Sequence, residues 1–105
     1  MNIAEIIRNT TKPLFSFEVL PPLKGTSIES IYRTIDPLLE FNPQFINITT
    51  HCEQYDSTGK RTRKRPGTVA VAAAIKHKYN IPVVPHILCG GFTREETEYV
   101  LIDLN

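Results

Sequence analysis

The sequence predicts an α/β fold of parallel strands and helices, of the (β/α)8 barrel type, with only the first three β/α units present. After a short helix over residues 3–8, strand-like segments start near residues 14, 45 and 83, and a helix-like segment follows each. Crossovers long enough to hold a helix make the strands parallel. Polar residues on one side of every strand favour a barrel over a doubly wound sheet, whose GxGxxG turn does not follow the first strand.

The first unit combines a strand bounded by prolines with a capped helix. Aromatic and β-branched residues place the strand at residues 14–20. The helix is expected to begin at the N-cap Thr26, with Glu29 completing a capping box, and to end about residue 41, before Asn42-Pro43. Pro37 is expected to kink this helix, because a proline removes one helical hydrogen bond.

The second unit contains a long polar loop. Its strand is expected at residues 45–49, and the loop covers residues 50–65. An alanine-rich helix follows over about residues 67–79, and Asn80 suits the left-handed position that ends many helices.

The third unit opens with a strand at residues 83–88. Pro85 predicts a bulge there, because a proline cannot donate a hydrogen bond to a sheet. Thr93 and Glu96 form a second capping box at the start of the last helix. That helix stops with the chain, so we expect residues 1–105 to be an incomplete domain, the amino-terminal part of a longer barrel.

Charge and cysteine content disfavour several classes of protein. The 12 Lys and Arg residues against 11 Asp and Glu residues leave no global field for binding nucleic acid or a membrane surface. The longest apolar run is too short to span a bilayer, and the first residues lack the pattern of a secretory leader. Two cysteines are too few for a disulfide framework, so a reducing, cytoplasmic setting is expected.

Three chemically capable side chains converge at the carboxyl ends of the expected strands. Because successive strand residues face opposite sides, Glu18, Thr49 and His86 fall on the polar side, at the end where barrel enzymes hold their active sites. The structural alternatives are an arginine partner for Glu18, a satisfied core histidine for His86 and ordinary strand packing for Thr49. Their convergence favours a site, with Glu18 as the residue most expected to carry chemistry.

Two further groups of residues have both a structural and a functional interpretation. The basic run at residues 60–65 is either a solvated loop, which we favour, or an anion site for phosphates or a polycarboxylate tail. Aromatic residues do not interleave with its charges, so nucleic-acid binding is not indicated. His51, Cys52, His86 and Cys89 match no recurrent ligand spacing, so no metal site is expected.

Three strings of residues resemble one enzyme family. Residues 16–22 (SFEVLPP) resemble the SFEFFPP signature that opens methylenetetrahydrofolate reductases. Residues 45–49 (FINIT) are similar to the family's F-V-S-V-T, and residues 85–89 (PHILC) to its P-H-L-T-C, before a Thr-Arg-Glu-Glu helix start. Three motifs in the right order over nearly the whole chain make the resemblance specific.

The resemblance implies a flavoprotein (β/α)8 barrel that reduces 5,10-methylenetetrahydrofolate to 5-methyltetrahydrofolate. NAD(P)H reduces FAD and leaves, and the folate then takes its place and receives the hydride. Glu18 is implied as the general acid that protonates the folate on its N10 side, which an apolar strand end can favour by desolvation. Thr49, Thr50 and His86 are implied as flavin contacts. The full-length enzyme is expected to be a homo-oligomer of one-carbon metabolism that supplies methionine synthesis.

The chain departs from the family pattern after its second strand. The family commonly continues Tyr-Gly-Ala, whereas this chain has Thr50-His51-Cys52 and a longer, more basic loop; Val19-Leu20 also replaces an aromatic pair. A whole barrel needs roughly 250 residues, so about three of its eight units are present, and we expect this chain to be inactive by itself. Two alternatives stay open: a non-catalytic piece that folds only by association, and another barrel enzyme that uses Glu18 as acid or base on a phosphorylated substrate.

Overall fold

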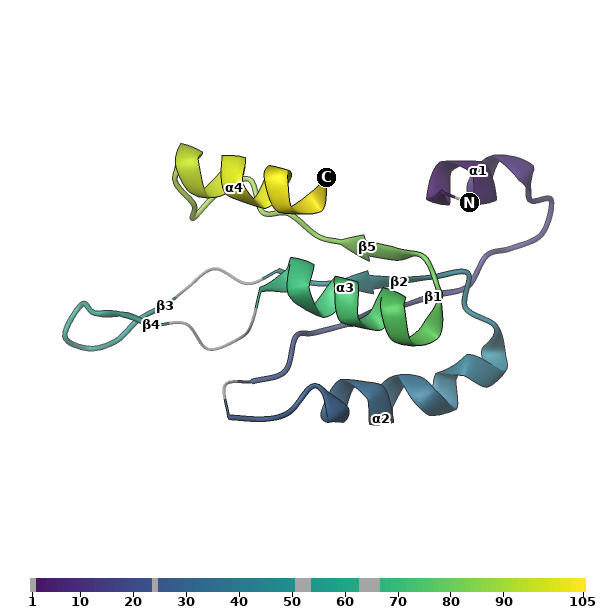
Figure 1. Ribbon diagram of the computed structural model, residues 1–105, viewed down its shortest axis with the longest axis horizontal. Coiled ribbons are helices and arrows are strands. Elements are labelled where there is room, and N and C mark those ends of the chain that lie inside the picture. Colours follow the sequence, from purple (N-terminus) through teal and green to yellow (C-terminus); the bar gives the residue numbers. More distant parts are fainter. Residues whose placement is uncertain (1, 24, 51–53, 63–66) are drawn as a thin grey trace.

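Three short parallel strands form the main sheet. The computed structural model describes residues 2–23, 25–50, 54–62 and 67–105. The sheet contains β1 (Ser16–Val19), β2 (Phe45–Ile48) and β5 (Val83–Pro85) in that order, all parallel (Figure 1). The predicted number, order and direction of these strands are therefore confirmed. Each strand is shorter than expected, and prolines at or near the strand ends contribute to this because they have no amide to donate.

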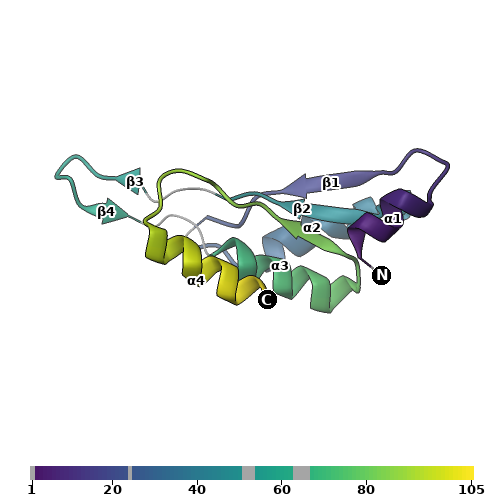
Figure 2. The same ribbon diagram turned by 90° about the horizontal axis from the view of Figure 1, so that it is seen from above.

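Two helices cover one face of this sheet. α2 (Glu29–Leu38) and α3 (Thr68–Tyr79) lie on the same side of the strands (Figure 2). Apolar residues three and four apart put one face of each helix toward the strands. The buried cluster between them consists of Val19, Ile31, Ile35, Ile46, Ile48, Val71, Ala72 and Ile75. Burying each larger aliphatic side chain stabilises the fold by roughly 1.5–3 kcal/mol, so this layer holds the helices to the sheet.

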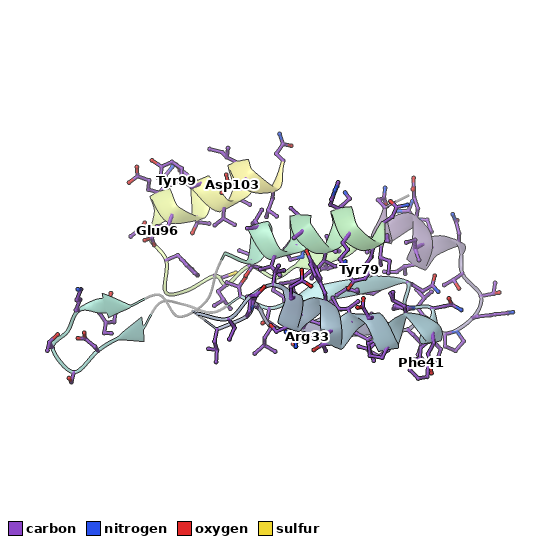
Figure 3. The ribbon with its side chains drawn as sticks, turned by 60° about the horizontal axis from the view of Figure 1, so that its bottom comes forward. Arg33, Phe41, Tyr79, Glu96, Tyr99 and Asp103 are labelled. Atoms are coloured by element: carbon purple, nitrogen blue, oxygen red, sulfur yellow. The ribbon has the colours of Figure 1, made fainter. Side chains whose placement is uncertain are left out.

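A tyrosine hydroxyl adds a polar link between the two covering helices. The Tyr79 hydroxyl, from the end of α3, donates a hydrogen bond to Asp36 Oδ1 in α2 at 2.7 Å and lies 3.2 Å from the carbonyl oxygen of Tyr32. Figure 3 labels Tyr79 between α3 and α2. The rings of Tyr32 and Tyr79 meet edge to face at 5.8 Å, and Lys78 Nζ lies 4.6 Å from the centre of the Tyr32 ring. Burial, followed by the hydrogen bond and charge of Asp36, raises the pKa of Tyr79 above its ordinary value of 10.0.

The start of α2 differs from the prediction. The N-cap residue is Ile28, which offers no side-chain cap, and the Thr26 hydroxyl donates to the Leu23 carbonyl instead. The Ser27 hydroxyl accepts the Glu29 amide at 3.1 Å. The predicted capping box at Thr26 is therefore wrong: Ser27 lies two residues before Glu29 and satisfies its amide in a local turn, as serine side chains often do.

The end of α2 follows the prediction in outline. Pro37 lies in the last turn of the α-helix, which ends at Leu38 and continues as the tighter helix η1 (Leu39–Phe41). The missing amide of Pro37 thus falls close to the point where regular helical bonding stops. Asn42 closes this segment in the left-handed conformation, with φ of 50°, and is followed by the buried Pro43.

The expected loop over residues 50–65 contains a small antiparallel hairpin instead of irregular backbone alone. It pairs β3 (Gln54–Tyr55) with β4 (Arg61–Thr62) and stands beyond the carboxyl ends of the main strands (Figure 1). Asp56 Oδ1 accepts hydrogen bonds from the Thr58 amide and hydroxyl and from the Lys60 amide, and Gly59 takes a φ of 80°. This Asp-x-x-Gly turn chemistry was the available signal, but two residues per strand leave too short a pattern to predict.

The remaining element ends largely agree with the sequence. α3 begins after Gly67 and ends at Asn80, whose φ is 52°, and Thr93 and Glu96 form the expected capping box of α4 (Arg94–Leu104). The short first helix is α1 (Ile3–Asn9), and neither α1 nor α4 has a buried residue. The bulge predicted at Pro85 is wrong, because Pro85 pairs in unbroken register with Ile48. It is tolerated as the last residue of a strand at the edge of this three-stranded sheet.

Candidate functional site

The face of the sheet opposite α2 and α3 carries the polar strand residues. Val19 and Ile48 point to the helices and are buried, so the alternating residues Glu18 and Asn47 lie on the other face. The register puts Glu18 beside Asn47, and Asn47 beside Val84. Glu18 is exposed and Asn47 is half-buried. This open face, defined by Glu18, Asn47, Thr49 and His86, is the candidate site.

Thr49 and His86 form the next row of the open face, two residues nearer the carboxyl ends than Glu18. Backbone pairing reaches this row, because the Thr49 amide donates to the Val19 carbonyl at 3.1 Å and the His86 amide to the Ile48 carbonyl at 2.8 Å. Both side chains are half-buried. The predicted placement of Glu18, Thr49 and His86 on one face is therefore confirmed, while their chemical roles stay predictions.

The surroundings of Glu18 differ from those expected. Among the described residues none donates a hydrogen bond to its carboxylate, and its side chain is exposed although Pro21 and Pro22 are buried. The desolvation expected of a proline-flanked strand end is thus not supplied by these residues. The closest polar neighbour by register is Asn47, whose Nδ2 lies 3.4 Å from Ser16 Oγ.

Thr50 lies on the helix side of the sheet rather than on the open face. Its hydroxyl is 2.7 Å from Thr68 Oγ1 and also contacts the His86 carbonyl oxygen. The Thr68 hydroxyl in turn donates to the Thr49 carbonyl oxygen at 2.8 Å. Thr68 was not predicted from the sequence, because a threonine in the first turn of a helix is not by itself a signal of a contact with a distant strand end.

No metal site is formed by the residues that the structure describes, since they contain no group of three or more His, Cys, Asp or Glu side chains suited to hold an ion. Cys89 is a free, exposed thiol. His51 and Cys52 lie outside the described residues, and so do residues 63–65 of the basic run. The anion-site interpretation of that run therefore stays a prediction.

Across the described ranges, none of the helices has the length and apolar character needed to cross a membrane.

The comparison with known families decides the affiliation of the chain. The family model described as methylenetetrahydrofolate reductase matches residues 2–104. The chain belongs to the methylenetetrahydrofolate reductase family. The resemblance read from the three sequence motifs is thereby confirmed. Within this family, the three parallel β/α units are the part of the barrel-type fold that the structure shows.

Curated relatives carry the same family name at low identity. The chain is 27% identical over 88 residues to the 5,10-methylenetetrahydrofolate reductase of Salmonella typhimurium, covering 84% of this chain and 27% of that protein. It is 26% identical over 88 residues to the same enzyme of Pectobacterium carotovorum, and 25% identical to that of Escherichia coli, with the same coverage of each. The chain thus spans about a quarter of the length of the curated relatives it matches.

Proposed function

We propose that this chain is the amino-terminal part of an enzyme that reduces 5,10-methylenetetrahydrofolate to 5-methyltetrahydrofolate with NAD(P)H and FAD. The observation that carries the proposal is the open face of the sheet in a member of this family. It holds a carboxylate, a hydroxyl and an imidazole at the carboxyl ends of adjacent parallel strands. In barrel enzymes that end carries the chemistry.

Glu18 is the proposed general acid. As a proton donor it would protonate the folate on its N10 side, which helps the five-membered ring to open. A general acid must hold its proton near neutral pH and lie within hydrogen-bond reach of the atom it protonates. Glu18 is exposed and has no donor among the described residues, so its carboxyl is free to meet a substrate.

Thr49 and His86 fit the flavin contacts proposed for them. Both are half-buried and lie side by side by register on the open face. When bound, FAD would supply the hydride. Thr50 fits a direct contact less well, because its hydroxyl is already engaged by Thr68 and by the His86 carbonyl. We therefore keep Thr49 and His86 as proposed cofactor residues and assign Thr50 a different task below.

The residues present make up only part of such a site. With about three of eight units, the residues that the structure describes place no further strand beside β1 or β5 in the main sheet. We propose that the 105-residue chain neither binds FAD tightly nor turns over by itself, and that the complete enzyme is a cytoplasmic homo-oligomer. Purified chain that carried one flavin per molecule, seen by absorbance, would contradict the first of these statements.

The role of Glu18 is tested by separating the two half-reactions of the complete enzyme. Glu18→Gln removes the proton and keeps the shape of the side chain. We expect flavin reduction by NAD(P)H to be spared, and the folate half-reaction to fall by about 100-fold or more, the usual contribution of a general acid. Glu40→Gln, an exposed glutamate in η1, is the matched control and is expected to leave both half-reactions unchanged. Equal loss of both half-reactions in Glu18→Gln would refute the assignment.

A further inference from the structure

Two threonine hydroxyls tie together the carboxyl ends of β2 and β5. The Thr50 hydroxyl contacts both the Thr68 hydroxyl, at 2.7 Å, and the carbonyl oxygen of His86. The Thr68 hydroxyl donates to the carbonyl oxygen of Thr49 at 2.8 Å. These contacts join three separate parts of the chain, the end of β2, the first turn of α3 and the end of β5. We call Thr50 and Thr68 the hydroxyl clamp.

The clamp acts on the backbone of the two residues that we propose as flavin contacts. Thr49 donates its amide to Val19 of β1, and its carbonyl is held by Thr68. His86 donates its amide to Ile48 of β2, and its carbonyl is held by Thr50. Each residue thus has its amide and its carbonyl fixed, one on either side of Cα. Because the direction of the Cα–Cβ bond follows from those two groups, the clamp sets where each side chain leaves the backbone.

The clamp is placed where regular pairing stops. The paired register ends at Ile48 and Pro85, one residue before Thr49 and His86. Carbonyl groups at such a boundary have lost the next bond of the sheet and need another donor when they are partly buried. The hydroxyls of Thr50 and Thr68 supply it from the helix side of the sheet.

We propose that Thr50 and Thr68 are positioning residues that aim Thr49 and His86 into the open face. The link to flavin rests on the function proposed above, but the positioning concerns this chain alone. The hydroxyl of Thr50 sits on Cβ, close enough to the backbone to contact the neighbouring His86 carbonyl.

The test replaces each hydroxyl by a methyl group and measures the two clamped residues by NMR. Thr50→Val and Thr68→Val keep the branched shape of the side chain. We expect Thr50→Val to move the carbonyl carbon shift of His86 and to spread its χ1 angle over more than one rotamer. We expect Thr68→Val to do the same to Thr49. Thr50→Ser and Thr68→Ser retain the hydroxyl and are expected to keep the wild-type shifts and rotamers.

A merely structural role would lower stability without moving these signals. Val71→Ala is the control, since Val71 is buried in α3 and contributes only to the apolar cluster. It is expected to lower the urea midpoint while leaving the Thr49 and His86 signals unchanged. Valine variants that fold with unchanged shifts and rotamers overturn the proposal. If the valine variants do not fold, the serine variants decide, because serine variants that lose the ordered rotamers also overturn it.

The flavin affinity of the complete enzyme is an independent second measurement of the effect of each clamp variant. Loss of one clamp hydroxyl is expected to weaken flavin binding by about three- to tenfold, the usual worth of one hydrogen bond, and serine is expected to restore it. The NMR measurements use neither flavin nor folate. If the rotamers of Thr49 and His86 become disordered while flavin affinity stays the same, the clamp is supported and the proposed flavin contacts are contradicted. If the rotamers stay the same, the clamp is refuted, whatever happens to flavin affinity.

Discussion

Removing the hydroxyl of Tyr79 is expected to loosen the contact between α2 and α3 without disturbing their apolar packing. Tyr79→Phe keeps the ring that meets Tyr32 at 5.8 Å and deletes only the hydrogen bond to Asp36 at 2.7 Å. A hydrogen bond to a charged group is worth about 1.5–3 kcal/mol, and exposure of Asp36 to water puts this one near or below the lower limit. We therefore expect a loss of about 1 kcal/mol in the free energy of unfolding.

The measurement is urea unfolding followed by circular dichroism, with a thermal scan beside it. A loss of 1 kcal/mol lowers Tm by about 4–8 °C in a domain near this size. Tyr99→Phe is the matched control: its hydroxyl also donates to a carboxylate, Glu95 Oε1, at 2.7 Å, but within one exposed helix. That variant is expected to unfold as the wild type does. Equal destabilisation by both substitutions would refute the argument that Tyr79 links two helices.

Titration adds a second check on Tyr79. Its pKa is raised in the folded protein, so folding favours the protonated hydroxyl. The contribution of the protonated hydroxyl to the free energy of unfolding is fully present below the unfolded-state pKa of about 10. It is lost as the pH rises from there through the higher folded-state pKa. The difference in unfolding free energy between wild type and Tyr79→Phe should therefore be constant up to about pH 9 and shrink in more alkaline solution. A constant difference through this range would show that Tyr79 titrates alike in both states.

Three further predictions concern the core and two turns. Ile48→Ala is expected to cost about 2–5 kcal/mol, because a fully buried isoleucine in the middle strand leaves a cavity; a shift below 1 kcal/mol in urea unfolding would count against a well-packed layer. Hydrogen bonds from the Thr58 hydroxyl and the Lys60 amide hold the pKa of Asp56 below its ordinary value. The ionised Asp56 therefore stabilises the turn at pH values above its unfolded-state pKa, and this stabilisation is lost as the pH falls through the folded-state pKa. Amide shifts of Thr58 and Lys60 should follow that acid titration and not respond in Asp56→Ala. Asn80→Val is expected to destabilise α3 by about 1–2 kcal/mol, because a β-branched residue resists a φ of 52°, whereas Asn80→Gly should be nearly neutral in the same assay.

The larger pattern of the fold could be predicted because it rests on residues of strong preference. Strand segments rich in Phe, Ile and Val alternate with helices whose apolar residues recur at helical spacing, and this fixed the order and direction of β1, β2 and β5. Asn42 and Asn80 at the helix ends were also informative, since both take the left-handed conformation there. Thr93 and Glu96 capped α4 as expected.

The failures have local physical causes. Ser27 competed with Thr26 for the start of α2, and two side chains with the same chemistry one residue apart cannot be ranked from sequence. Pro85 did not force a bulge, because its place at the end of an edge strand leaves no bond for it to break. Thr68 contacts Thr50 behind the candidate site, and the two residues are 18 apart in the sequence, so no local pattern encodes this contact.

Three site residues could be placed on one face from the sequence, because side chains alternate between the two faces of every strand. Glu18, Thr49 and His86 follow from counting in twos along β1, β2 and β5 once the register is known. Thr50 was assigned by family resemblance alone. The alternation that puts Thr49 on the open face puts Thr50 behind it, beside α3.

The two faces of the sheet are subject to different constraints during evolution. The eight residues of the buried apolar cluster lie in the layer between the sheet and its two helices, on the face opposite Glu18. Substitutions on the open face therefore cost this unit little stability, whereas substitutions behind it are limited by packing. Such a separation lets residues of the open face change while the supporting layer stays the same. It is a physical reason why chains only about a quarter identical can belong to one family.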